Sequence, residues 1–159
     1  MRRRQFLALV GAAAFRPRGA YSQATKVPVI GILLSGNPDP GIFLQGFRAA
    51  LAEAGYIEGQ NIRLEVRSAE GKPALLPERA AELVRLKVDV IVTSLTPTAV
   101  AAKQASSDIP IVMAAAGDPV QSGLVASLAR PGGNITGISA ASAEIAGKSL
   151  ELAREIIPS

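Results

Sequence analysis

The apolar residues of the chain are grouped into short runs separated by longer stretches of mixed composition. The runs at 27–34, 88–93 and 109–113 are apolar on nearly every residue and rich in Val and Ile, which is typical of strands buried on both faces of a parallel sheet. Residues 61–67 alternate apolar with polar or charged side chains, which predicts a strand nearer a sheet edge. Residues 134–138, which follow a Pro-Gly-Gly turn, are the last predicted strand.

The stretches between and after these runs have the periodicity of helices. Thr96 is predicted to be the N-cap of the third helix, with Pro97 at its first position. Strands and helices alternate throughout, which predicts an α/β fold: a doubly wound parallel sheet of about five strands with helices on both faces. The predicted helices are 43–55, 77–86, 97–106, 120–130 and 143–157.

One strand end carries an acidic residue in the turn Gly117-Asp118-Pro119. Pro119 has no N–H and disfavours a helical conformation at Asp118, so the backbone turns there. Ligands of open parallel sheets lie beyond the carboxyl ends of the strands, which makes Asp118 a candidate ligand contact. Asp in such a turn also commonly serves only to accept hydrogen bonds from nearby backbone N–H groups. The pattern leaves both interpretations open.

The composition excludes several classes of site. The chain has 159 residues, enough for one domain with a real core, and it contains no His, Cys or Trp. Histidine triads, His-ligated metals, thiolate metal sites and disulfides are therefore excluded, and we expect neither a cofactor nor a metal ion. The chain also lacks the G-x-G-x-x-G, P-loop and G-x-S-x-G motifs. We therefore expect a protein that is not an enzyme.

The first 24 residues contain the three regions of an export signal in order. Arg2-Arg3-Arg4 precedes an apolar run at 6–15, and Ser22-Gln23-Ala24 supplies small residues for cleavage near Ala24. The sequence RRQFL also resembles the twin-arginine consensus R-R-x-F-L; a basic amphipathic tail is the alternative. The net charge of +4 derives from this leader, because residues 25–159 contain 12 basic and 13 acidic residues. It gives no support for nucleic-acid binding, and the predicted location is the periplasm.

Six segments, taken together, resemble a known family. They are RRRQFLALVG, PVIGILLSGNPDP, FRAALAEAGYIEGQNIRLEVRSAEG, LPERAAELVRLKVDVIVTSLTPTAVAAKQA, IPIVMAAAGDPVQSGLVASLARPGGNITGIS and GKSLELAREIIP. Over nearly its whole length the chain resembles ABC-transporter substrate-binding proteins of the TrpX/YtrF-like type, which have a type I periplasmic-binding-protein fold. The order and spacing of the segments carry this resemblance, since no single motif is diagnostic.

The resemblance implies capture of a small solute such as an amino acid outside the inner membrane and its delivery to an ABC permease. Such proteins clamp the ligand between two α/β lobes, so the strand-end loops of the first lobe would face the cleft. Ser94 and Thr96 would offer hydroxyl and N–H groups to a carboxylate, and Asp118 would accept a hydrogen bond from an amino group. Carried over by position, the ligand-binding residues are Ser35, Gly36, Ser94, Leu95, Thr96, Ala115, Ala116, Asp118 and Pro119.

Proteins of this type are considerably longer than this chain, which therefore resembles the first of their two lobes. The implied organisation is an export signal at 1–24, a ligand-binding lobe at 25–141 and a helix at 142–159 that leads toward an absent second lobe. Such an incomplete copy would need a separately encoded second lobe or a homodimer to rebuild the cleft. The alternatives are a small α/β enzyme, a regulatory or sensor domain of the same fold, and a non-functional fragment with no independent binding.

Overall fold

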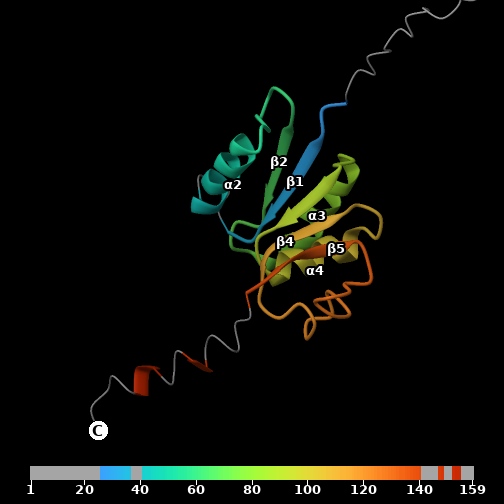
Figure 1. The fold of residues 1–159 in the computed structure, drawn as a ribbon. Helices are drawn as coiled ribbons and strands as arrows, with labels where there is room; N and C mark the ends of the chain where they lie inside the picture. The colour runs from blue at the N-terminus through green and yellow to red at the C-terminus, as the bar shows by residue number, and fades with distance from the viewer. Residues whose placement is uncertain (1–25, 37–40, 141–146, 149–151, 155–159) are drawn as a thin grey trace, which may run out of the picture.

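The chain folds around one parallel sheet, seen in a computed structural model that describes residues 26–36, 41–140, 147–148 and 152–154 (Figure 1). Within this part of the chain the strand order is β2-β1-β3-β4-β5, and every neighbouring pair is parallel. The carboxyl ends of the strands therefore lie along the same edge of the sheet. The strands are β1 (Val29–Leu34), β2 (Arg63–Ser68), β3 (Val90–Thr93), β4 (Ile111–Ala116) and β5 (Ile135–Ser139).

Helices cover both faces of the sheet, which confirms the predicted doubly wound α/β fold. The chain moves from β1 outward to β2 through α2 (Ile42–Glu53), which packs on one face. It then returns across β1 to β3 and continues to β4, so that α3 (Leu76–Arg85) and α4 (Thr96–Ala105) pack on the opposite face (Figure 1). The 3₁₀ turn η1 (Pro73–Leu75) precedes α3 directly.

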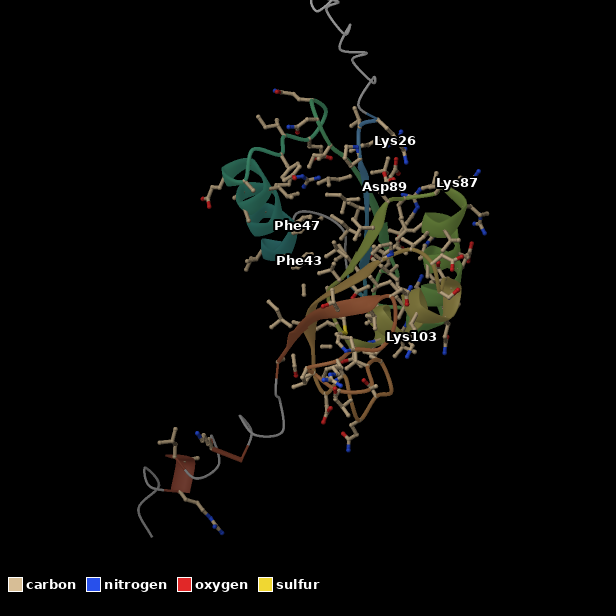
Figure 2. The ribbon with its side chains drawn as sticks, turned by 45° about the vertical axis from the view of Figure 1, so that its right-hand side comes forward. Lys26, Phe43, Phe47, Lys87, Asp89 and Lys103 are labelled. Atoms are coloured by element: carbon tan, nitrogen blue, oxygen red, sulfur yellow. The ribbon has the colours of Figure 1, made fainter. Side chains whose placement is uncertain are left out.

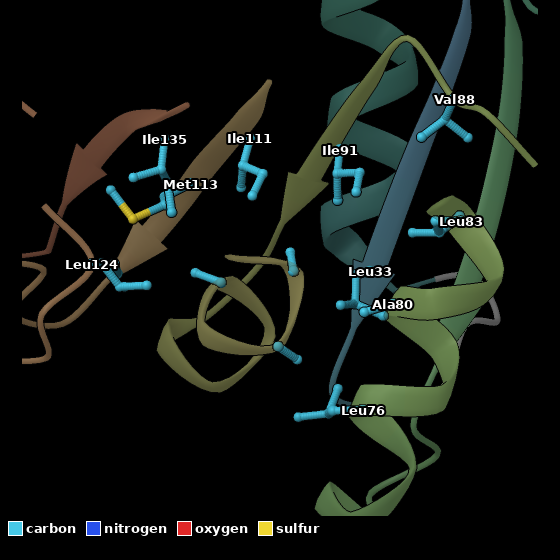
Figure 3. Packing of buried hydrophobic residues seen from close by; sticks show 14 of the residues in the cluster. Leu33, Leu76, Ala80, Leu83, Val88, Ile91, Ile111, Met113, Leu124 and Ile135 are labelled. Atoms are coloured by element: carbon cyan, nitrogen blue, oxygen red, sulfur yellow. The ribbon is translucent and has the colours of Figure 1, made fainter. Parts of the chain in front are cut away.

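The larger hydrophobic cluster lies between the sheet and the pair α3 and α4 (Figure 3). Because alternate side chains of a strand point to opposite faces, Leu33 belongs to this cluster, whereas Ile32 and Leu34 face α2. Both sets are buried, as expected for a central parallel strand that is covered on both faces. The large side chains of the cluster that Figure 3 labels are Leu33, Leu76, Leu83, Val88, Ile91, Ile111, Met113, Leu124 and Ile135.

The smaller cluster lies under α2. Leu44 is its buried helical residue, and the partly buried rings of Phe43 and Phe47 pack against it. These two rings stack with their centroids 5.9 Å apart, and both point from α2 toward the sheet in Figure 2. Phe43, Leu44 and Phe47 lie on one side of the helix, as the period of an α-helix requires.

The helix predicted at 120–130 is wrong, because the structure has turns and bends over these residues. A single helix-like turn forms, in which the Ser122 N–H donates to the Asp118 carbonyl oxygen at 3.0 Å. Gly123 then adopts a φ of +70°, a left-handed conformation that ends helices. The apolar residues Leu124 and Val125, which suggested a helical stripe, are instead buried in the larger cluster from this irregular segment.

Two other predicted segments lie wholly or mostly outside the described residues. The export signal at 1–24 is one of them, and it stays a prediction. The helix at 143–157 is the other, and only 147–148 and 152–154 of it are described, as helical. Within the described part of the chain no helix has the length and apolar character needed to cross a membrane.

Candidate functional site

The candidate site is the edge of the sheet where β1, β3 and β4 end. We call the three loops at this edge the rim, defined as Ser35–Gly36 after β1, Ser94–Thr96 after β3, and Ala115–Pro119 at the end of β4 and beyond it. The parallel pairing aligns Leu33 with Thr93 and Thr93 with Met113. The rim loops therefore begin at similar levels on three neighbouring strands.

Thr96 connects two of the rim loops. Its hydroxyl oxygen accepts a hydrogen bond from the N–H of Gly117, at 2.9 Å and 21 residues away in the sequence. The strand that follows reinforces this contact, since Ser139 at the end of β5 donates from its hydroxyl to the Gly117 carbonyl oxygen at 3.3 Å. Gly117 is thus the point at which the ends of β3, β4 and β5 meet.

The prediction that Thr96 caps α4 is wrong, since Leu95 occupies the N-cap position and Thr96 is already helical. The capping hydroxyl belongs to Thr98, which accepts from the Leu95 N–H at 3.1 Å and donates to the Leu95 carbonyl oxygen at 2.6 Å. Pro97 follows at the second helical position, where the missing N–H costs nothing. Because the Thr98 hydroxyl makes the capping hydrogen bonds to Leu95, the Thr96 hydroxyl is free to accept from the Gly117 N–H.

Asp118 folds back on its own loop. Its Oδ1 atom accepts hydrogen bonds from the N–H groups of Val120 at 3.1 Å and Gln121 at 2.9 Å, so the residue stabilises its turn as its residue type suggested. The side chain is nevertheless exposed, and its Oδ2 atom makes no hydrogen bond to the described residues. Each oxygen of a carboxylate can accept hydrogen bonds. The contacts of Oδ1 within the turn therefore leave Oδ2 able to accept a hydrogen bond from a solute.

The other predicted rim residues differ widely in exposure. Ala116 is fully buried in the larger cluster and Pro119 is almost wholly buried, so neither residue presents surface to a solute. Ser94, Ala115 and Ser35 are half-buried, and Gly36 is exposed. Leu95 stands out because 51% of this large apolar residue is exposed.

Two exposed apolar residues near the rim were missed by the sequence reasoning. Ile42, the first residue of α2, is 90% exposed, and Val120, one residue beyond the rim, is 45% exposed. With Leu95 they place a large apolar side chain after each of β1, β3 and β4. Such exposed residues beside a polar rim are characteristic of ligand or partner contact surfaces. The apolar periodicity of 43–55 did not include Ile42, which is why it went unnoticed.

Two hydroxyl groups at the strand ends have buried oxygen atoms without a hydrogen-bond partner among the described residues. They are Ser35, which was predicted as a site residue, and Thr93, which was not. Thr93 is the last residue of β3 and only 1% exposed. A buried hydroxyl without a partner costs about 1–3 kcal/mol, so a functional reason is worth seeking. The only signal in the sequence was a polar residue at the end of an apolar strand.

The ionisable groups with shifted pKa values lie away from the rim. At the opposite edge of the sheet, hydrogen bonds from the Lys26 ammonium at 2.6 Å and the Val29 N–H at 2.8 Å lower the pKa of Asp89 (Figure 2). Burial alone would raise the pKa of Glu82 on α3, but its hydrogen bonds with Arg79 and Arg67 outweigh burial and lower it. The described residues contain no group of three or more side chains suited to hold a metal ion.

The sequence of the chain matches the model of one protein family. The model for ABC transporter substrate binding proteins matches residues 26–159, which is most of the chain and all of the described fold. The chain belongs to this family. Members of the family of ABC transporter substrate binding proteins bind solutes, which agrees with the absence of catalytic motifs noted in the sequence.

Relatives of the chain support this assignment and show its extent. A tyrosine-binding protein from Clostridioides difficile (strain R20291) is 43% identical over 95 residues, which are 60% of this chain and 28% of the relative. The solved structure of an ABC domain in complex with L-Trp from Streptococcus pneumonia matches with a TM-score of 0.65 and 33% identity, over 70% of this chain and 38% of that one.

Another solved structure also matches the fold of the chain. It is a conserved domain protein from Vibrio cholerae O1 biovar El Tor, with a TM-score of 0.77, 36% identity, and coverage of 84% of this chain and 45% of that one. The chain thus spans less than half the length of each of these three proteins. Its fold corresponds to one part of each.

Proposed function

We propose that the chain binds a small solute, an amino acid in particular, at the rim, as the extracytoplasmic binding component of an ABC importer. The observation that carries the proposal is the exposure of the large apolar residue Leu95 within the rim and of Val120 next to Pro119 of the rim, with Ile42 exposed at the start of the helix that follows β1. A small-molecule site combines such apolar contacts, which supply affinity, with a few fixed polar groups, which set the orientation. Family membership supplies the class of function.

The rim offers groups of the right chemistry for the carboxylate of an amino acid. The first hydrogen bond within α4 is made by the Ala99 N–H, so the N–H of the half-buried Thr96 has no acceptor inside the helix. Helix N-termini favour negative charge. The Thr96 hydroxyl, whose oxygen already accepts from Gly117, still has its proton to donate. A carboxylate at the start of α4 would satisfy these donors.

Asp118 would receive the amino group. Its Oδ2 atom makes no hydrogen bond to the described residues, while Oδ1 holds the turn. An ammonium group placed there would form a charge-assisted hydrogen bond, which is stronger than a neutral one. The side chain of the solute would then lie against Leu95. The relatives named for tyrosine and for a complex with L-Trp make aromatic amino acids the first probes to use.

The remaining parts of the proposal concern how the rim acts in transport. The leader at 1–24 would direct the chain to the periplasm with cleavage near Ala24, and an ABC permease in the inner membrane would receive the solute. The rim is one wall of a cleft, so residues 25–141 would act as one ligand-binding lobe, with residues 142–159 leading away from it. A second lobe or a second copy of the chain would supply the opposing wall and cover Leu95 and Val120.

Thermal unfolding with candidate solutes tests this function. We expect L-tyrosine or L-tryptophan, at about one hundred times its Kd, to stabilise the chain by about 3 kcal/mol, and the D-enantiomers to have no effect. Leu95→Asn should abolish the shift. Leu86→Asn is the matched control, because Leu86 is also a half-exposed leucine but follows α3 at the opposite edge of the sheet. If no L-amino acid shifts the melting of the wild-type chain, the chain does not bind amino acids by itself.

A further inference from the structure

The peptide group between Ala116 and Gly117 is held at both of its ends. The Ala116 carbonyl oxygen accepts from the Ala140 N–H at 2.7 Å, and the Gly117 N–H donates to the Thr96 hydroxyl oxygen at 2.9 Å. The first contact continues the pairing of β4 with β5, so it follows from the sheet. The second is made by a side chain from another loop, and nothing in the strand pairing requires it.

The segment after this peptide depends on such contacts, because it lacks a regular helix. Residues 117–131 have turns and bends, so their backbone groups must find partners outside a helical ladder. Lys103 of α4 provides two of them, since its ammonium donates to the carbonyl oxygens of Gly123 at 2.6 Å and Leu124 at 3.0 Å. Thr96 acts at the rim end of the same segment, next to Asp118. Figure 2 shows Lys103 on the side where this segment passes α4.

We propose that Thr96 is a positioning residue of the rim, which fixes the Ala116–Gly117 peptide and thereby the direction in which Asp118 leaves β4. This inference rests on the proposed solute-binding function. Because the Gly117 N–H occupies one lone pair of the Thr96 oxygen, the hydroxyl proton points away from that N–H and can be donated to another acceptor. The β-branched side chain of Thr has few χ1 rotamers, so this orientation is maintained before a solute arrives.

The ligand-free protein allows a direct test by amide hydrogen exchange at Gly117. In the full-length wild-type chain we expect the Gly117 amide to exchange more slowly than the amide of Gly133, an exposed loop glycine. Thr96→Val keeps the shape but removes the acceptor, and we expect about a tenfold loss of protection at Gly117. Thr96→Ser keeps the oxygen and should retain most of the protection. Amides of β1 should be unchanged in both variants.

Thr136→Val is the control for replacing a threonine in this part of the sheet, because Thr136 lies exposed on β5 and its side chain makes no hydrogen bond within the described residues. It should leave Gly117 exchange at the wild-type rate. Calorimetry with L-tyrosine then measures the consequence for binding: Thr96→Val should weaken it at least tenfold, whereas Thr96→Ser should restore most of the affinity.

Several results would overturn the inference. They are a wild-type Gly117 amide that exchanges as fast as that of Gly133, equal protection in wild type and Thr96→Val, and a Thr96→Ser variant that matches Thr96→Val. The comparison of Gly117 with Gly133 uses only the wild-type chain, so the inference can still be tested if Thr96→Val fails to fold. Absence of L-tyrosine binding to the wild type would count against the proposed function instead, while the exchange data would still decide the role of Thr96.

Discussion

Gly137 is a position at which one added methyl group should cause a severe and localised defect. It pairs with Met113 across β4 and β5, next to a shift in the register of these strands between Met113 and Ala116. A Cβ atom on Gly137 would lie 2.6 Å from the Met113 nitrogen and 2.8 Å from its carbonyl carbon, and would overlap the carbonyl oxygen more closely still. Its φ of +141° also disfavours any side chain. Gly137→Ala therefore has two separate costs.

The two costs can be estimated separately. Holding an alanine in this conformation costs about 1–3 kcal/mol. Displacing β5 from β4 to relieve an overlap with backbone atoms costs about 1–3 kcal/mol more, as for other overpacking changes. The sum, about 4 kcal/mol, is a large part of the 5–15 kcal/mol that stabilises a typical domain. For a chain of this size it corresponds to a fall in Tm of about 10 °C.

Gly123→Ala isolates the conformational part of this cost. Gly123 has a φ of +70°, but a Cβ there would have no other atom within 4 Å, so we expect a loss of about 1–2 kcal/mol. Urea unfolding of the two full-length variants, followed by far-UV circular dichroism, measures the difference. Equal losses in Gly137→Ala and Gly123→Ala would refute the argument that the backbone of Met113 blocks this site.

Further predictions follow from other parts of the fold. Leu83→Ala should cost about 3 kcal/mol in urea unfolding, because Leu83 is fully buried, whereas the half-exposed Leu86→Ala should cost less than about 1 kcal/mol; similar losses would contradict the assigned core. Thr98→Val should cost about 1 kcal/mol by leaving the Leu95 N–H without its acceptor, while the Leu95 carbonyl oxygen keeps the Ala99 N–H as donor, and Thr98→Ser should cost clearly less. Glu82 has a folded-state pKa below its usual value of 4.5, so it binds fewer protons when folded and stabilises the fold above about pH 4.5. The stability advantage of wild type over Glu82→Gln should thus be constant near neutral pH and decrease as the pH falls below about 4.5 through the folded-state pKa; an advantage that does not decrease in acid would disprove this.

The strands of the sheet could be predicted from the sequence because the pattern of apolar residues within each strand is local. Successive apolar residues in 27–34 and 88–93 reflect burial of β1 and β3 on both faces, and the alternation in 61–67 reflects the edge position of β2. Burial on both faces was wrong for 109–113, because Val112 on β4 is 36% exposed. The same reasoning failed at 120–130, where Leu124 and Val125 are buried without helical structure. An apolar pattern reports burial, and it indicates a helix only if the backbone can remain helical, which Gly123 prevents here.

The candidate site was less predictable because its contacts join residues far apart in the sequence. The alternation of strands and helices predicts a parallel sheet, whose strand-end loops share one edge, as found. The hydrogen bond from Gly117 to Thr96 depends on how β3 and β4 are aligned and on where α4 begins, and the predicted N-cap was displaced by one residue. The exposure of Ile42 and Leu95 was equally hidden, because an apolar residue near a strand end normally suggests core.

The core residues determine the stability of the fold, whereas the rim residues determine the affinity for a solute. Substitutions in the two regions should therefore have different effects. Buried side chains such as Leu83 hold α3 against the sheet. Truncating them therefore lowers the free energy of unfolding of the whole domain. The direction of the rim loops is fixed by single hydrogen bonds such as that of Thr96, each worth only about 1 kcal/mol in stability. A solute, however, contacts groups whose placement depends on those bonds. Core substitutions should therefore reduce the folded fraction at nearly constant affinity, whereas rim substitutions should reduce affinity at nearly constant stability. A Leu83→Ala variant that unfolds early but retains wild-type affinity when folded, beside a Thr96→Val variant with the opposite behaviour, would show that the rim is a solute site and more than an edge of the fold.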